Sequence, residues 1–151
     1  MRMRRPTRIA CLVIALGALA WLRDPPWVGG MSSGFRGWEE DPPGTRWRWT
    51  LGRASFFVPS DATSLTLPVR ALFPIAGGTP VVVRVSADDR FLADVVLTDG
   101  REWVRPLMPL PRRSNGRRYR RIDLHVSRTV GPFLLGVQMG EPALERADVA
   151  R

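Results

Sequence analysis

Apolar and polar residues alternate with a period of two over most of the chain after residue 33. Such alternation is typical of strands that bury one face and expose the other. Turn residues separate the runs about every ten positions, and no amphipathic helix of normal length is present. This rhythm predicts about eight or nine strands in an antiparallel β-sandwich of the jelly-roll kind, an all-β fold. The expected strands lie at 35–39, 46–50, 54–58, 65–69, 81–85, 91–97, 103–108, 119–127 and 134–140. The inward-facing residues are expected to include Val81, Val83 and Val85, then Phe91, Ala93, Val95 and Leu97, and finally Ile122, Leu124 and Val126. Asp88–Arg90 and Thr98–Arg101 are expected to be tight hairpin connections.

The most aromatic part of this pattern is an expected hairpin centred on residues 46–50. Trp47 and Trp49 alternate with Arg46 and Arg48, so a strand here places both tryptophans on one face and both arginines on the other. Burying the tryptophan face is the simplest way to give the domain a core, because tryptophan buries a large apolar area. On that interpretation Trp49→Ala loses roughly 3–5 kcal/mol of stability.

The first 22 residues have the pattern of an export signal. Residues 1–8 are basic, and the fourteen residues from Ile9 to Leu22 carry no charge. As a helix this run spans about 21 Å, less than the roughly 30 Å of the hydrocarbon core, which is typical of a signal peptide. Ala18–Ala20 fits a cleavage site, whereas Trp21 is typical of an anchor at the membrane interface. Residues 1–22 are therefore expected to be either a signal peptide or a signal-anchor helix.

The rest of the chain divides into three expected parts. Residues 23–33 are rich in proline, glycine and serine and predict a linker, and residues 34–142 predict the β-sandwich domain. Residues 143–151 are a tail that is expected to fray or to form a short helical turn. The arginines before the apolar run predict that the domain lies outside the cytoplasm, in the cell envelope, either secreted or attached to the membrane through residues 9–22.

Charge and cysteine content narrow the range of partners. The 151-residue chain carries a formal charge of +9, and all 23 of its basic residues are arginine. Four arginines precede the apolar run, so the remainder carries 9 − 4 = +5, less than a dedicated nucleic-acid-binding domain requires. The only cysteine, Cys11, lies inside the apolar run and offers the domain neither a disulfide nor a thiol site. We expect no nucleic-acid partner.

Several short segments occur in an order that is shared with a known type of module. They are Gly34–Glu39, Arg48–Thr50, Arg53-Ala54, Phe57–Pro59, Arg120–Leu124, Val126-Ser127 and Leu135–Pro142. In these segments the domain resembles a β-rich extracytoplasmic module that is fused to the C-terminus of bacterial multi-spanning glycosyltransferases and also occurs as small exported proteins. The chain departs from it at residues 129–132, where a tryptophan is expected after the threonine. The resemblance implies an envelope-glycan context and a glycosyltransferase as a partner, and it implies no catalytic residue.

Residues with the chemistry of an enzyme active site are few. Glu39 and Glu40 are adjacent, and consecutive residues of a strand point to opposite faces, so they do not form the opposed pair of a glycosidase. His125, the only histidine, is expected to face solvent beside Asp123 with no nucleophile in reach. No metal-ligand spacing, phosphate loop or dinucleotide fingerprint occurs. We expect no catalysis, no metal and no cofactor.

Aromatic residues are the first candidates for ligand binding, because flat aromatic faces suit the apolar faces of sugar rings. Core packing is expected for most of them, and the candidates for a sugar platform are Trp38 and Phe57. Phe57 is out of phase with Phe56, so its side chain faces solvent, the second sheet or a ligand.

Arginines are the second group of candidates. Residues 112–121 hold six arginines around a Ser-Asn-Gly turn, of which Arg112, Arg113, Arg117 and Arg118 are the expected binding residues. They predict either a solvated hairpin or attraction to anionic lipid head groups or acidic envelope polymers.

Together these patterns predict a non-catalytic module of the cell envelope. Its expected role is that of an accessory or glycan-binding-like domain, associated with surface polysaccharide or with glycosyltransferase machinery. The alternative is a membrane-tethered structural or protein-interaction domain without a glycan ligand. A glycan-binding screen separates the two.

Overall fold

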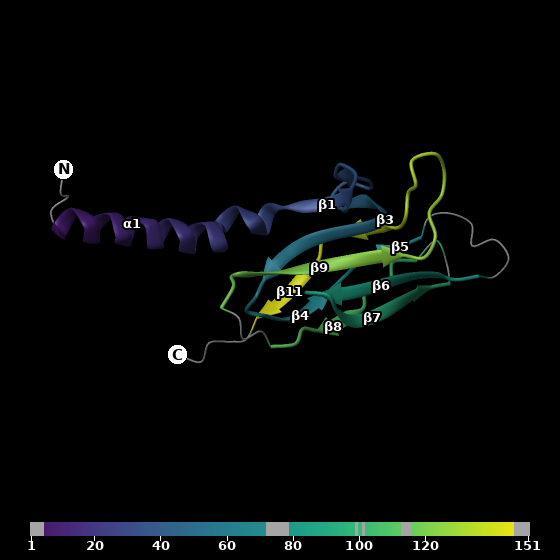
Figure 1. Cartoon of the computed structure of the whole chain (residues 1–151). Helices are drawn as coiled ribbons and strands as arrows, with labels where there is room; N and C mark the ends of the chain where they lie inside the picture. Colours follow the sequence, from purple (N-terminus) through teal and green to yellow (C-terminus); the bar gives the residue numbers. More distant parts are fainter. Residues whose placement is uncertain (1–4, 72–78, 99, 101, 113–115, 147–151) are drawn as a thin grey trace.

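The computed structural model describes residues 5–71, 79–98, 100, 102–112 and 116–146. Helix α1 (Arg5–Arg23) extends away from a β-rich domain, with the N-terminus at its far end (Figure 1). A short 3-10 helix, η1 (Pro26–Gly30), follows it. The rest of the regular structure in the described part of the chain consists of strands. An all-β sandwich preceded by one N-terminal helix is therefore confirmed.

The strands form two antiparallel sheets, drawn in Figure 1. The larger sheet has the order β5-β10-β3-β9-β6-β7, and β1 and β2 also pair with β3. The smaller sheet has the order β11-β4-β8. The strand bounds are β1 (Ser32–Phe35), β2 (Glu39–Glu40), β3 (Arg46–Pro59), β4 (Ala62–Thr66), β5 (Val69–Arg70), β6 (Val81–Ala87), β7 (Arg90–Leu97), β8 (Leu107–Pro109), β9 (Tyr119–Val126), β10 (Gln138–Gly140) and β11 (Ala143–Arg146).

One apolar core lies between the inner face of the larger sheet and the smaller sheet. Residues paired across neighbouring strands point to the same side of the sheet. On the inner side, alternate residues of β3, β9 and β6 are apolar and lie next to one another. The expected inward residues of β9, namely Ile122, Leu124 and Val126, are buried. Leu65 of β4 and Met108 of β8 close the core from the other sheet.

Strand β3 differs from the prediction of two strands separated at Leu51 and Gly52. It is one strand of 14 residues, because it pairs first with β10 and then with β9 along its length. Gly52 therefore does not interrupt the extended backbone, and the same alternation of side chains runs from Arg46 to Pro59.

This continuity reverses the expected orientation of the tryptophan strand. Arg48 faces Met139 of the core across β10, and the Phe35 ring contacts both the Arg48 guanidinium, at 3.6 Å, and the Phe56 ring, at 6.3 Å between centroids. Arg48 thus lies on the core side, and the expectation that the tryptophan face forms the core is wrong. Trp49 lies on the outer face instead.

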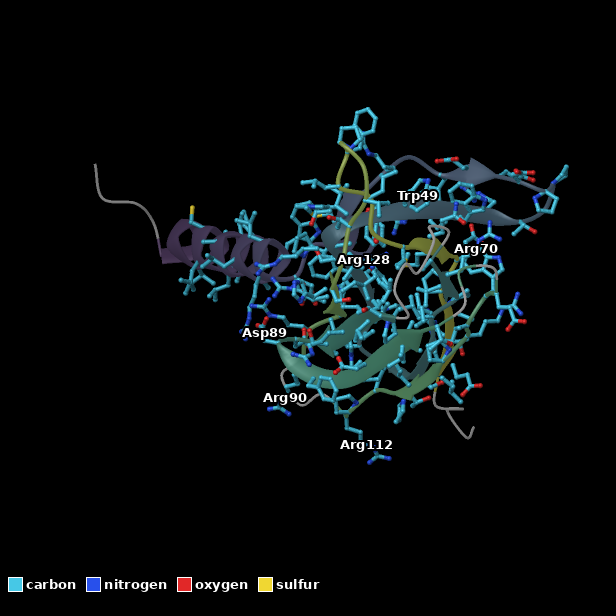
Figure 2. The ribbon with its side chains drawn as sticks, turned by 90° about the vertical axis from the view of Figure 1, so that its right-hand side faces the viewer. Trp49, Arg70, Asp89, Arg90, Arg112 and Arg128 are labelled. Carbon is cyan, nitrogen blue, oxygen red and sulfur yellow. The ribbon has the colours of Figure 1, made fainter. Side chains whose placement is uncertain are left out.

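The outer face around Trp49 has its own aromatic packing. Trp47 is buried and packs edge to face against Trp49, with ring centroids 5.9 Å apart. Gln138 stands between Trp49 and Arg70 across the sheet, and Figure 2 shows Trp49 and Arg70 on the same side of the molecule. Of the aromatic residues expected in the core, Phe56 belongs to the core cluster and Trp47 does not.

The hairpin of β6 and β7 confirms one predicted turn and corrects one predicted face. Asp88 and Asp89 form a two-residue connection with positive φ angles of 49° and 65°, as a tight hairpin requires. A β-bulge follows, so Phe91 faces Ser86 on the outer side and is 61% exposed instead of pointing inward. The other predicted connection, Thr98–Arg101, lies partly outside the described residues.

Several expected strands have other bounds than predicted, and one strand was not predicted. Of the segment 103–108 only Leu107 and Met108 belong to a sheet, and of the segment 134–140 only Gln138–Gly140 does. The expected strand 35–39 is divided between β1 and β2, and the expected strand 65–69 between β4 and β5. Ala143–Arg146, expected as tail, forms β11 because it pairs with β4. The tail beyond residue 146 lies outside the described residues.

Helix α1 is apolar and unpaired with the domain. A window from Ile9 to Gly30 is long and apolar enough to cross a membrane by length and composition, and none of it is buried in the protein. Signal sequences have the same properties. The 19 residues of α1 span about 28 Å, close to the roughly 30 Å hydrocarbon core. This N-terminal helix fits either a signal or an anchor.

The segment expected as a linker, residues 23–33, contacts the domain. The Asp24 carboxylate accepts a hydrogen bond from the Arg118 backbone N–H at 2.7 Å. A Cβ added at Gly29 would overlap the Tyr119 ring, so η1 lies close against the start of β9. Ser32 and Ser33 already belong to β1.

Candidate functional site

The outer face of the larger sheet carries three rows of side chains, most of them polar, that cross its strands. The register of β3, β9, β6 and β7 aligns them, because directly opposed residues share a face. The first row is Arg53, His125, Arg84 and Asp94; the second is Ser33, Ser55, Asp123, Ser86 and Phe91; the third is Phe57 and Arg121, next to the Asp88-Asp89 turn.

The rows line a shallow groove with a volume of about 460 Å³. Its floor is β9, and its sides are β1 and β3 on one side and β6 with the Asp88-Asp89 turn on the other. The lining is Ser33, Arg53, Ala54, Ser55, Arg84, Ser86, Asp89, Arg121, Asp123, Leu124 and His125. Serine hydroxyls, carboxylates and guanidinium groups thus face one open space.

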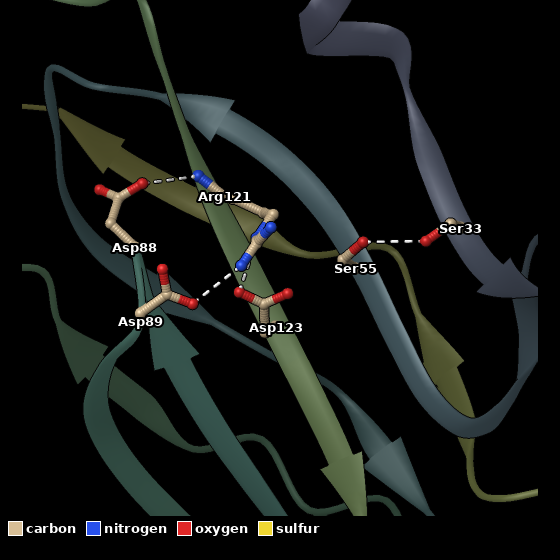
Figure 3. A network of polar contacts seen from close by, with 6 residues as sticks. All are labelled: Ser33, Ser55, Asp88, Asp89, Arg121 and Asp123. Carbon is tan, nitrogen blue, oxygen red and sulfur yellow. Dashed lines mark hydrogen bonds and ion pairs between the residues drawn. The ribbon is translucent and has the colours of Figure 1, made fainter.

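Arg121 organises one end of the groove (Figure 3). Its side chain forms ion pairs with Asp123 and Asp89, each at 2.9 Å, and its backbone N–H donates to the Asp88 carboxylate at 3.1 Å. The hydrogen bond to Asp123, with a further contribution from Asp89, raises the pKa of Arg121 above its ordinary value. The guanidinium therefore stays charged and holds both carboxylates in place.

Arg84 and Asp94 form a second fixed pair at another side of the groove. The Arg84 guanidinium donates two parallel hydrogen bonds to the two carboxylate oxygens of Asp94, at 2.9 and 3.0 Å. These bonds lower the pKa of Asp94 and raise that of Arg84. Arg84 also lies 5.7 Å from the centre of the exposed Phe91 ring. The orientation of the Arg84 guanidinium is therefore fixed by the Asp94 carboxylate and by the Phe91 ring.

Arg53, His125 and two serines supply the groups that remain open to a ligand. Arg53 and His125 are exposed, and neither makes an ion pair or a side-chain hydrogen bond within the described part of the chain. The hydroxyls of Ser33 and Ser55 lie 3.0 Å apart across β1 and β3 and bridge the two strands (Figure 3). The groove thus combines fixed charged pairs with unsatisfied donors and acceptors.

The aromatic candidates lie at different distances from this groove. Phe57 is half-buried opposite Arg121, on the same face but not among the groove-lining residues. Trp38 is 39% exposed at another place, where its ring lies 5.1 Å from the Arg46 guanidinium and 4.5 Å from that of Arg48. The structure does not bring the two candidates together.

The arginine candidates lie at the end of the domain next to η1. Arg112, Arg117 and Arg118 are exposed, and Arg112 projects away from the ribbon in Figure 2. Arg113 lies outside the described residues. Arg118 is joined to Asp24 through its backbone, so the basic loop lies beside the chain that leaves helix α1. These residues are separate from the groove.

The two groups considered for catalysis occupy the positions expected from their strands. His125 faces outward, between Arg53 and Arg84 across the sheet, as predicted. Glu39 and Glu40 are exposed on β2, and the Glu40 carboxylate accepts a hydrogen bond from the Gly44 backbone N–H at 2.6 Å. Glu40 therefore stabilises the turn that precedes β3.

The likenesses found among known proteins are distant and structural. No protein-family model matches the chain, and no curated protein matches it. Among solved structures, one similar chain is described as "EclA C-terminal domain; sugar-binding protein". The two chains are 11% identical with a TM-score of 0.39, and the match covers 60% of this chain and 76% of that chain. A TM-score at this level supports no inference about a ligand.

Proposed function

We propose that this protein is a non-catalytic glycan-binding module of the cell envelope and that its ligand lies along the groove on the outer sheet face. The observation that carries the proposal is the alignment of three rows of mostly polar side chains along one groove on the outer sheet face. Sugar hydroxyls both donate and accept hydrogen bonds, and the rows present carboxylates, guanidinium groups and serine hydroxyls side by side. Phe91, next to the lining residue Ser86, adds an exposed aromatic ring at the groove edge.

The arrangement of charges favours binding over catalysis. Asp123 and Asp89 are both held by Arg121, and Asp94 is held by Arg84, so these carboxylates are fixed acceptors. A glycosidase requires two carboxyl groups on opposite sides of a bond, one of them with a raised pKa. In the Arg84–Asp94 pair the guanidinium lowers the pKa of the Asp94 carboxyl, which is the opposite of what a general acid requires.

The source of the glycan follows from the N-terminal helix and from the resemblance to modules fused to glycosyltransferases. Helix α1 fits an export signal or a membrane anchor, and either role supports a location of the domain on the outer side of the membrane. Surface polysaccharide is the glycan that such a domain meets. An association with glycosyltransferase machinery belongs to the same proposal.

A glycan panel tests the proposal with the full chain in detergent micelles. The panel contains neutral and acidic bacterial surface polysaccharides, and wild type is expected to bind at least one of them. The double variant Arg53→Ala/His125→Ala is expected to lose about tenfold in affinity or more, because a hydrogen bond to a charged group contributes about 1.5–3 kcal/mol. Both residues are exposed, so the melting temperature is expected to stay unchanged.

Arg112→Ala is the matched control, because it removes an exposed arginine outside the groove. It is expected to bind like wild type. The proposal fails if wild type binds no member of the panel, or if the double variant binds as tightly as the control.

A further inference from the structure

A second hollow of about 430 Å³ lies at the other end of β3. Trp103, Arg105, Arg46 and Glu141 line it, together with the turn that precedes β3 and the backbone of Gly140. It shares no lining residue with the groove on the outer sheet face. Any ligand of this cavity is therefore independent of the proposed glycan groove.

The Trp103 ring is held in place by a chain of contacts from the sheet. Gln138 is 2% exposed, and its side-chain oxygen accepts a hydrogen bond from Arg70 Nε at 2.6 Å. The Arg70 guanidinium in turn lies 4.7 Å from the centre of the Trp103 ring. Such stacking fixes the plane of the indole, and a fixed aromatic plane is what stacking on a sugar ring requires.

Gly140 allows this ring to lie close to strand β10. A Cβ added at Gly140 would lie 3.1 Å from Pro68 and 3.7 Å from the Trp103 ring. A larger side chain would therefore fill the space beside the indole. The absence of a side chain at Gly140 leaves the cavity open next to Trp103.

The charges at the cavity favour an anionic ligand. Arg46 forms an ion pair with Glu141 at 2.9 Å, and both side chains are more than half exposed. Ion pairs of this kind contribute little to stability, so a ligand carboxylate replaces Glu141 at low cost. Arg105 is exposed and forms no ion pair within the described part of the chain. Two arginines and one glutamate leave an excess of one positive charge.

We propose that this cavity binds the uronic acid residue of an acidic glycan. Trp103 packs against the apolar face of the sugar ring, and Arg105 and Arg46 bind its carboxylate, for which the planar guanidinium has the matching geometry. The negative charge of a uronic acid is attracted by the lining arginines Arg105 and Arg46 and by Arg70 beside the Trp103 ring. The proposal holds whether or not the groove on the sheet face binds a glycan.

Titration of the full chain with oligogalacturonide tests the proposal, with a neutral galactose oligomer as the comparison ligand. Binding is measured by calorimetry in detergent micelles. Wild type is expected to bind the acidic oligomer at least tenfold more tightly than the neutral one. Arg105→Gln is expected to lower the affinity for the acidic oligomer about tenfold. Glu141→Gln is expected to raise it several-fold, because it releases Arg46 from its competing partner.

The direction in which Glu141→Gln changes the affinity for oligogalacturonide is the most informative result. An increase is expected if Glu141 competes with the ligand for Arg46, whereas a purely structural role of Glu141 would lead to a decrease. Arg90→Gln is the matched control, because Arg90 is an exposed arginine that lines neither cavity, and it is expected to leave oligogalacturonide binding unchanged. The proposal is overturned if wild type does not prefer the acidic oligomer, if Glu141→Gln fails to raise the affinity, or if Arg90→Gln lowers it as much as Arg105→Gln. Melting temperatures of all variants show that each one is folded.

Discussion

The side chains of strand β3 alternate with the same period in both halves of the strand. On the face toward the core, however, the second half carries apolar side chains and the first half carries polar ones. In the second half the apolar residues Ala54, Phe56 and Val58 face the core. In the first half the same face carries Arg48 and Thr50, and the tryptophans face outward. Alternation therefore defines two faces of a strand, and the neighbouring strands decide which face meets the core.

The first half tolerates arginine on its inner face because aromatic rings enclose the charge. The Arg48 guanidinium lies 3.6 Å from the Phe35 ring centre and 4.5 Å from that of Trp38, and its Nη1 donates to the Ser32 hydroxyl at 3.1 Å. Its Nε has no hydrogen-bond partner, and burial lowers the pKa of Arg48. Cation–π contacts offset part of the desolvation of this residue.

The largest expected effect separates the two halves directly. Phe56→Ala is expected to lose roughly 3–5 kcal/mol, because Phe56 is 5% exposed and lies in the main core. Trp49→Ala is expected to lose about half as much, since Trp49 is half-buried outside that core. Urea denaturation of the full chain in micelles measures both. If both substitutions lower the free energy of unfolding equally, the tryptophan face contributes as much to stability as the main core.

A smaller effect is expected at Arg48. Arg48→Met keeps the packing against Phe35 and Trp38 and removes the buried charge, so stability is expected to stay constant or to rise by about 1 kcal/mol. Arg48→Ala leaves a gap beside both rings and is expected to destabilise the domain by about 1–3 kcal/mol. The order of the melting temperatures, Met above Ala, checks this account. If both substitutions destabilise equally, the charge itself stabilises the fold.

The smallest effect on stability is expected for the exposed arginines of the loop before β9. Replacing Arg112, Arg117 and Arg118 by serine is expected to change stability by less than about 0.5 kcal/mol. Binding of the full chain to anionic liposomes is expected to fall, because this loop lies beside the residues that follow helix α1. Sedimentation with neutral and anionic liposomes at two salt concentrations measures it. Binding that does not depend on salt or on these arginines would leave the loop as a solvated surface.

Much of the fold was predictable from the sequence because it depends on local alternation. The alternation in β6 and β9 predicts correctly which residues point inward, and the residue types of the Asp88-Asp89 turn predict its tight hairpin. The shift at Phe91 was not predictable, because a β-bulge moves a side chain to the other face without a change in composition. Strand β11 was missed because its pairing with β4 joins segments far apart in the sequence.

The groove was predictable only in part, for a related reason. The outward direction of His125 and Asp123 follows from the alternation in β9. Which residues stand beside them depends on the order β3-β9-β6, and these strands are distant in the sequence. Ser55 and Ser86 face Asp123 only in the folded sheet. Residue type and strand parity indicate Trp38 and Phe57 as aromatic candidates, but they contain no information on the residues that lie beside them.

The central claim is that the outer face of the second half of β3 binds a glycan, whereas its inner face builds the core. Amide chemical-shift mapping of the full chain in micelles, with the tightest-binding oligosaccharide of the panel, tests it most directly. The account predicts shifts at Arg53, Ser55, Asp123 and Ser86, which line the groove. It predicts no shift at Thr50 or Leu65, which are buried on the core side. Shifts confined to other surfaces, with none in the groove, would contradict it.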